Sequence, residues 1–138
     1  MKTSTRHRRL LPLLILCCIT VSSCSILGLQ GTPEEIVAKR AQAWANALLR
    51  GDLKGAYDYT SPNYRQFATM GRYHARVEGT WRWEKADLRN VECEPEACTV
   101  TFNLQYDVKH LGLKDIRRPR EYRWVLVDKR WWLYVPAK

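Results

Sequence analysis

The chain has 138 residues, a formal net charge of +9 and a hydrophobic content of 46%. It is too apolar to be disordered, and its 7 glycines and 6 prolines are too few for a collagen-like or low-complexity chain. Two full domains or a TIM barrel would need a longer chain, so we expect one folded domain.

The first two dozen residues have the layout of a secretory signal. An apolar run over residues 10–19 follows the basic residues Lys2, Arg6, Arg8 and Arg9. This run is about half the ~20 residues that a membrane-spanning helix needs, and Pro12 interrupts it. We therefore expect a cleaved signal rather than a permanent transmembrane helix.

Val21-Ser22-Ser23-Cys24, directly after the apolar run, resembles the lipobox of bacterial lipoproteins. In that family the cysteine is acylated, for example with palmitate, and becomes the first residue after cleavage. The resemblance implies a signal peptide over residues 1–23, lipidation at Cys24 and a lipidated tether over 24–31. Ser25 stands where an Asp typically retains such proteins at the inner membrane, which implies the outer membrane. An ordinary signal peptide that happens to contain Cys24 stays open.

Two cysteines remain once the expected signal and the lipid site are set aside, namely Cys93 and Cys98. Four residues separate them, as in a hairpin whose two strands place the side chains opposite each other. In an oxidising compartment we predict a disulfide, which would contribute about 2 kcal/mol. A redox pair is disfavoured because it would favour Cys-X-X-Cys, and a metal site is disfavoured because neighbouring histidines are lacking.

Helical patterns dominate the chain up to about residue 78. Thr32, Pro33 and Glu35 predict a capped helix start, and Gly51 predicts its end. The expected buried face comprises Val37, Ala41, Trp44 and Leu48, broadened by Ile36, Ala45 and Ala47, with Lys39, Arg40 and Arg50 left outside. Asp52 caps a second short helix, Ser61-Pro62 starts a third, and a fourth is expected around residues 68–78 in spite of Gly71.

From residue 80 the period changes to that of strands. Residues 80–84 alternate, residues 99–108 form the cleanest strand, and residues 121–127 and 131–135 are two further strands around a turn at 128–130. Short turns between strands indicate an antiparallel sheet of about four strands. The expected fold class is α+β, with N-terminal helices packed on that sheet.

Two stretches resemble the nuclear transport factor 2-like superfamily. They read Ala41-x-x-Trp44-x-x-Ala47-Leu48-x-x-Gly51-Asp52-x-x-x-Ala56-Tyr57-x-x-x-Ser61-Pro62-x-Tyr64 and Tyr122-x-Trp124-x-Leu126-Val127-Asp128-x-x-Trp131-Trp132. The resemblance implies a domain over residues 32–138 in which a curved, cystatin-like sheet wraps the first helix as a cone. The family's pocket lies inside that cone. Here its expected lining is Trp44, Tyr57, Tyr64, Trp83, Tyr106 and Trp124, with Leu48, Trp81, Phe102, Leu104 and Trp131 as further candidates.

Whether that cone is hollow or filled stays open, because aromatics at these spacings are also typical of a packed core. Family enzymes use an Asp or His in the cone as a base, for which His74 and Asp58 are the candidates here. His110 is expected to face solvent, and Asp107 falls on the polar face of its strand. No position matches a family catalytic motif, so a non-catalytic protein is favoured, without cofactor or metal.

A basic run lies near the C-terminus and comprises Lys109, Lys114, Arg117, Arg118, Arg120 and Arg123. It could meet anionic lipid headgroups or an acidic partner, or it could be a long solvated hairpin loop kept soluble by its charge. Residues 109–120 carry no aromatic side chain for base stacking, and cleavage would remove four other basic residues. We therefore expect no nucleic-acid partner.

The sequence thus predicts a lipid-anchored protein of the bacterial cell envelope, on the outer membrane and facing the periplasm. Its cone is expected to bind a small amphipathic ligand or an envelope protein partner. A pure assembly subunit of an envelope complex is a further option. The alternative from another class is a cone-shaped enzyme of the hydratase or isomerase type that uses His74 or Asp58.

Overall fold

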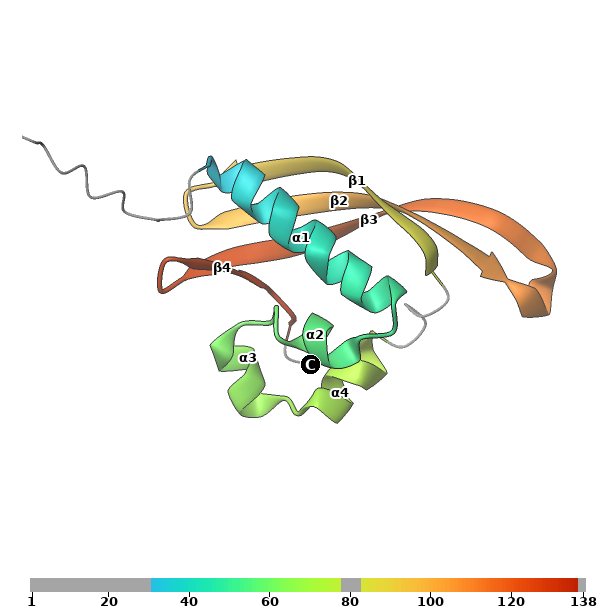
Figure 1. Cartoon of the computed structure of the whole chain (residues 1–138), viewed down its shortest axis with the longest axis horizontal. Helices are drawn as coiled ribbons and strands as arrows, with labels where there is room; N and C mark the ends of the chain where they lie inside the picture. Colours follow the sequence, from blue (N-terminus) through green and yellow to red (C-terminus); the bar gives the residue numbers. More distant parts are fainter. Residues whose placement is uncertain (1–30, 78–82, 137–138) are drawn as a thin grey trace, which may run out of the picture.

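A computed structural model describes residues 31–77 and 83–136 (Figure 1). The predictions for the signal peptide, Cys24, most of the tether and Trp81 lie outside these residues. The helices are α1 (Pro33–Leu49), α2 (Leu53–Tyr57), α3 (Pro62–Phe67) and α4 (Met70–Arg76). The strands are β1 (Trp83–Glu94), β2 (Ala97–Val108), β3 (Leu113–Val127) and β4 (Arg130–Leu133), with a 3-10 helix, η2 (Lys109–Leu111), between β2 and β3.

The four strands form one antiparallel sheet in the order β1-β2-β3-β4. Helix α1 lies across one face of this curved sheet and packs on β1 and β2, while α2, α3 and α4 gather beyond β4 (Figure 1). A parallel bridge between Thr60 and Leu133 joins the segment after α2 to β4. This arrangement confirms the α+β class, with helices first and a four-stranded antiparallel sheet after them.

Capping residues fix the starts of the helices, as the sequence predicts for α1, α2 and α3. Thr32 and Glu35 form the capping box of α1, and Gly51 follows the helix with a φ of 72°. The hydroxyl or carboxylate oxygens of Asp52, Ser61 and Thr69 accept backbone N–H groups at the starts of α2, α3 and α4. The Thr69 cap supports α4 in spite of Gly71.

The predicted buried face of α1 is confirmed, but Arg40 was wrongly placed outside the fold. Its Nε donates to the Trp131 carbonyl oxygen at 2.8 Å, and its guanidinium lies over the rings of Tyr59 and Trp132. Burial, with the nearby charge of Arg130, lowers the pKa of Arg40. A long apolar stem and a planar cation let arginine pack on aromatic surface, so β4 covers the side of α1 that looked solvent-exposed.

The strands differ from prediction in length rather than in order. Residue 83 begins the described part of β1, which runs on to Glu94, and β4 ends at Leu133. Strand β3 begins at Leu113 rather than residue 121, so most of the basic run is paired strand and not a loop. Both faces of this segment are largely exposed, so its sequence shows no apolar alternation to reveal a strand. Asp128 and Lys129 alone form the last turn, both with positive φ.

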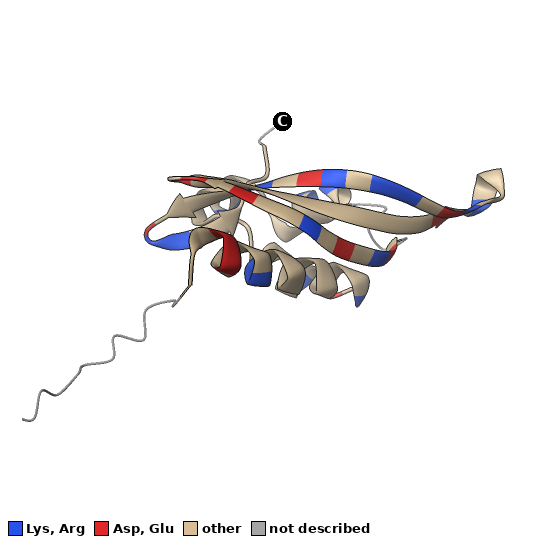
Figure 2. Ribbon diagram, turned by 90° about the horizontal axis from the view of Figure 1, so that it is seen from above, with Lys and Arg blue, Asp and Glu red and all other residues tan. Residues whose placement is uncertain are grey.

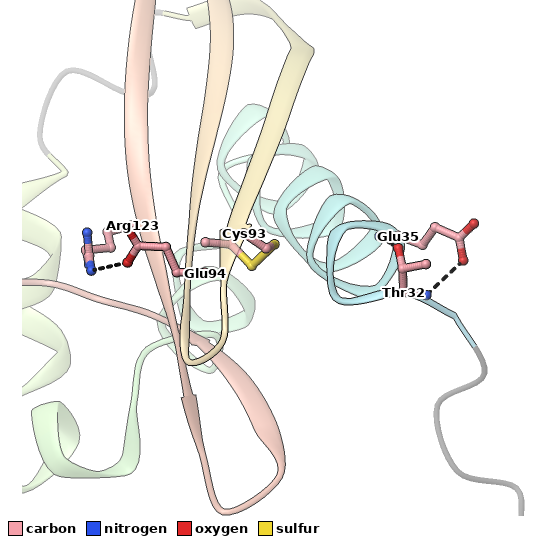
Figure 3. Close-up of a disulfide and its surroundings, with 6 residues drawn as sticks. Thr32, Glu35, Cys93, Glu94 and Arg123 are labelled. Carbon is pink, nitrogen blue, oxygen red and sulfur yellow. Dashed lines mark hydrogen bonds and ion pairs between the residues drawn. A yellow bond between two sulfur atoms is a disulfide. The ribbon is translucent and has the colours of Figure 1, made fainter.

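The predicted disulfide between Cys93 and Cys98 is confirmed. The two residues are direct cross-strand partners at the end of the β1–β2 hairpin, with Cα atoms 4.0 Å apart (Figure 3). An ion pair between Arg123 and Glu94, at 3.7 Å, joins β3 to the same end of β1. No helix within residues 31–77 or 83–136 is long and apolar enough to cross a membrane.

Candidate functional site

Aromatic side chains fill the space between α1 and the sheet. Trp44 is only 1% exposed, and the Trp83, Phe102, Tyr122 and Trp124 ring centroids all lie within 6.5 Å of its own. Trp124 and Phe102 are fully buried. Trp44 and Trp124, expected as pocket residues, are therefore packed core. The Trp44 indole thus lies at the centre of a cluster of packed aromatic rings.

The polar atoms of this core are matched only in part. Trp44 Nε1 donates to the Tyr73 hydroxyl at 3.0 Å, whereas Trp124 Nε1 is buried without a hydrogen-bond partner in the described chain. Burial raises the pKa of Tyr73 to about 12, and burial also raises the pKa of Tyr122 far above its ordinary value. Burial in this core thus favours the neutral form of both phenols.

The other predicted pocket residues come from different parts of the fold. Trp83 and Tyr106 are half-buried cross-strand partners where the described part of β1 begins. Tyr57 is also half-buried, and its hydroxyl donates to the Ala68 carbonyl oxygen at 2.7 Å. Tyr64 lines the groove described below, to which Ala68 also belongs.

The candidate catalytic groups lie on the surface. His74 is exposed on α4. Asp58 follows α2, is exposed, and pairs with Lys54 at 3.1 Å. His110 is exposed beside Gly112, as predicted. Neither His74 nor Asp58 lies in the aromatic core, and the described residues contain no group of three or more His, Cys, Asp or Glu side chains that could hold a metal ion.

A groove of about 590 Å³ lies between α3, α4, the end of β3 and the segment after β4. Apolar side chains make most of its surface, and Phe67 is 78% exposed within it. Two arginines one helical turn apart on α4, Arg72 and Arg76, also line it. The full lining is Ser61, Asn63, Tyr64, Phe67, Ala68, Arg72, Arg76, Val125, Val127, Tyr134, Val135 and Pro136.

Tyr64 is the one predicted pocket residue that lines this groove. Its side chain is 8% exposed, and its hydroxyl is buried without a hydrogen-bond partner in residues 31–77 and 83–136. Burial raises the pKa of Tyr64, while the positive charges of Arg76 and Arg72 act in the opposite direction. The groove thus combines an apolar surface with positive charge, an arrangement suited to a ligand that has an apolar part and an anionic group.

Sequence reasoning missed the rest of this groove. Its walls come from short helices and a strand end that carry no long periodic pattern. The available signal was the pair Arg72 and Arg76 at i and i+4. Arg72 is three residues after the Thr69 cap, and Phe67 is two residues before it. That spacing puts both cations on one side of α4, although it does not reveal what faces them.

No protein-family model matches the chain, and no curated protein matches its sequence. Among solved structures it is similar to a protein described as an NTF2-like transpeptidase from Campylobacter jejuni, with a TM-score of 0.48, 11% identity, and coverage of 72% of this chain and 98% of that one. It is also similar to a SEC-C motif-containing protein from Rhodopseudomonas palustris, with a TM-score of 0.44, 17% identity and 73% coverage of both chains. Similarity at this level carries no function across.

Proposed function

We propose that this protein is a non-catalytic lipoprotein of the bacterial envelope, anchored at the outer membrane through Cys24. Its NTF2-like domain binds a small amphipathic ligand. The signal layout before Cys24 supports the anchor. The Cys93–Cys98 disulfide supports an oxidising compartment, because such bonds persist outside the cytosol. One long helix, short helices and a four-stranded meander, in that order, support the NTF2-like assignment.

The ligand site in this proposal is the groove beside α3 and α4 and not the interior of the cone. One observation carries this choice: the groove offers about 590 Å³ of space, whereas aromatic rings surround Trp44 inside the cone. Sites for small molecules range from about 300 to 1,000 Å³ and combine apolar walls with a few polar groups. A concave groove also favours a small ligand over a protein partner.

The chemistry of the lining defines the ligand class. Phe67, Val125 and Val127 offer apolar contact to a hydrocarbon chain. Arg72 adds a guanidinium, which forms charge-assisted hydrogen bonds with a carboxylate or a phosphate. A fatty acid or another single-chain anionic amphiphile therefore suits both parts of the groove.

A dansyl-labelled fatty acid titrated into the full chain tests this proposal by its fluorescence. Phe67→Ala should weaken binding about tenfold, since the ring is exposed in the free protein and would be buried by the ligand. Arg72→Glu should weaken binding of the acid but not of the matching uncharged amide. Met70→Ala is the control, because Met70 is exposed on the same helix and is not part of the groove lining.

All these variants have the same N-terminal segment. Any binding of the fatty acid by that segment is therefore equal in all of them and does not affect the comparison. Equal affinities for Phe67→Ala and Met70→Ala would place the ligand elsewhere. Equal effects of Arg72→Glu on the acid and the amide would exclude recognition of the anionic group.

A further inference from the structure

Among residues 31–77 and 83–136, the β2–β3 hairpin extends beyond the other elements as an arm, which we define as residues 106–116. The described part of β1 begins opposite Tyr106, whereas the pairing of β2 with β3 continues to Val108 and Leu113. Figure 1 shows this ribbon, tipped by η2, projecting past the end of α1. The arm is therefore a surface that α1 does not cover.

One face of the arm is apolar. Tyr106 pairs with Ile116 and Val108 pairs with Leu113, and direct cross-strand partners lie on the same face. Leu111 adds a further apolar side chain at the tip, where it is 63% exposed, and Leu113 is 46% exposed. Tyr106, Val108 and Ile116 are half-buried, so the exposed apolar surface of the arm is Leu111 and Leu113 at its protruding tip, and such a surface indicates a binding site.

The backbone of the tip is held in a defined shape. Gly112 takes a φ of 65°, in the left-handed region where glycine is not strained. The Asp115 N–H donates to an Asp107 carboxylate oxygen at 2.9 Å, across a register shift between the strands. The exposed leucines therefore stand on an ordered turn.

Positive charge surrounds this apolar tip. Lys109, Lys114, Arg117, Arg118 and Arg120 are all exposed, and Figure 2 shows the basic residues along β3 towards the tip. The acidic side chains of the arm are Asp107 and Asp115, and Asp115 is already paired with Arg117 at 3.2 Å. Lys109 and Lys114 balance these two acids within the arm, and the net positive charge comes from Arg117, Arg118 and Arg120 in the adjoining part of β3.

We propose that the arm docks on an anionic lipid bilayer. In this mode Leu111 and Leu113 enter the region between headgroups and acyl chains, while Lys109 and Lys114 contact the lipid phosphates. The leucines suit the apolar interior of such a bilayer, and the lysines suit its negatively charged surface. A second copy of the chain is a poorer occupant, because its own basic residues would repel these. The proposal goes beyond the ligand-binding function and does not depend on acylation of Cys24.

Hydrogen–deuterium exchange of the full chain tests the proposal locally. Vesicles containing phosphatidylglycerol should slow amide exchange in residues 106–116, and vesicles of phosphatidylcholine alone should not. Because the readout is confined to the arm, membrane binding by the apolar segment at residues 10–19 does not enter it. Protection that is equal with both vesicle types, or absent with both, would overturn the proposal.

Substitutions in the arm then distinguish insertion of the leucines into the bilayer from adsorption of the lysines on its charged surface. Leu111→Ser with Leu113→Ser should raise the lipid concentration needed for half-maximal protection at least ~10-fold. Lys109→Glu with Lys114→Glu should raise it about 25-fold or more, at roughly fivefold per basic residue. Met70→Ser and Lys39→Glu, which change exposed residues on other elements, are the matched controls and should have no effect.

Two outcomes of this comparison would contradict the proposal. If the leucine variant binds like the unsubstituted chain, the tip does not insert. If protection of the arm appears without lipid, rises with protein concentration and disappears in the leucine variant, the occupant is a second copy of the chain.

Discussion

At the scale of single residues, the polar atoms of Trp44 and Tyr73 have a structural role that Phe could not fill. The sequence contains 6 Trp and 7 Tyr but only 2 Phe. In the core, Trp44 uses its indole N–H to bind the Tyr73 hydroxyl across 29 residues of sequence. A buried N–H without a partner costs about 1–3 kcal/mol, so this bond ties α4 to α1. Helical spacing predicts the burial of Trp44, but it cannot predict a partner on another helix.

Burial of Tyr73 predicts a loss of stability at alkaline pH. Its pKa is raised to about 12 in the folded protein, against roughly 10 in the unfolded chain. The unfolded state therefore releases its proton first, so this stabilisation is complete below pH ~10 and is lost as the pH rises towards ~12. The free energy of unfolding, measured with urea, should fall by about 2–3 kcal/mol per such tyrosine over that range.

Tyr73→Phe should make this decline smaller, with some slope left because burial also raises the pKa of Tyr122. The same variant should lower stability at pH 7 by about 1–3 kcal/mol, because it leaves the Trp44 N–H without its partner. Tyr134→Phe changes an exposed residue and is the control. An alkaline decline that is the same in the Tyr73 variant and the control would contradict this account.

At the scale of elements, the sequence predicts features that depend on neighbouring residues. It does not predict features that depend on contacts between distant segments. The starts of α1, α2 and α3 follow from capping residues that the sequence shows directly, whereas the Thr69 cap of α4 is identified only in the structure. The first half of β3 has no buried face, so only its pairing with β2 defines it as strand. Arg40 is half-buried because β4, more than 80 residues later, packs over it. No local pattern contains that information.

The Cys93–Cys98 bond is the covalent constraint among these elements, and its effect should be modest because it closes a short loop. Reduction of the wild-type protein should lower the free energy of unfolding by about 2 kcal/mol. Reductant should leave the stability of Cys93→Ala with Cys98→Ala unchanged, because no cysteine then remains in residues 31–77 or 83–136. Urea unfolding with and without dithiothreitol measures both effects, and non-reducing peptide mapping should link the two cysteines. A wild-type protein insensitive to reductant would argue against a stabilising bond.

At the scale of the whole molecule, the sequence predicts the architecture better than the site. The order of the elements indicates helices on an antiparallel sheet, and the structure has that form. Whether the space between α1 and the sheet can hold a ligand depends on how the rings from α1, β1, β2 and β3 pack around Trp44. The groove likewise needs α3, α4 and the end of β3 to meet. The filling of the core and the shape of the groove both depend on packing between distant segments, which the sequence pattern does not show.

Acylation at Cys24 and docking of the arm, the two proposed membrane contacts, would together set the orientation of the protein on a bilayer. The described chain begins near one end of the long axis of the molecule, and the arm lies at the other (Figure 1). Gly31 is the seventh residue after Cys24, which limits the reach of a tether to about 25 Å. A protein acylated at Cys24 and docked through the arm on the same bilayer would therefore lie with its long axis along the membrane surface.

The most direct test of the proposed anchoring is metabolic labelling with an alkyne analogue of palmitate, followed by cell fractionation. The unsubstituted protein should carry the label and remain with the outer membrane, whereas Cys24→Ala should lose the label. Cys18→Ala should stay labelled, because that residue would be removed with the signal. A Cys24→Ala protein that is still labelled, or an unsubstituted protein recovered unlabelled from the cytosol with its first methionine in place, would contradict the account.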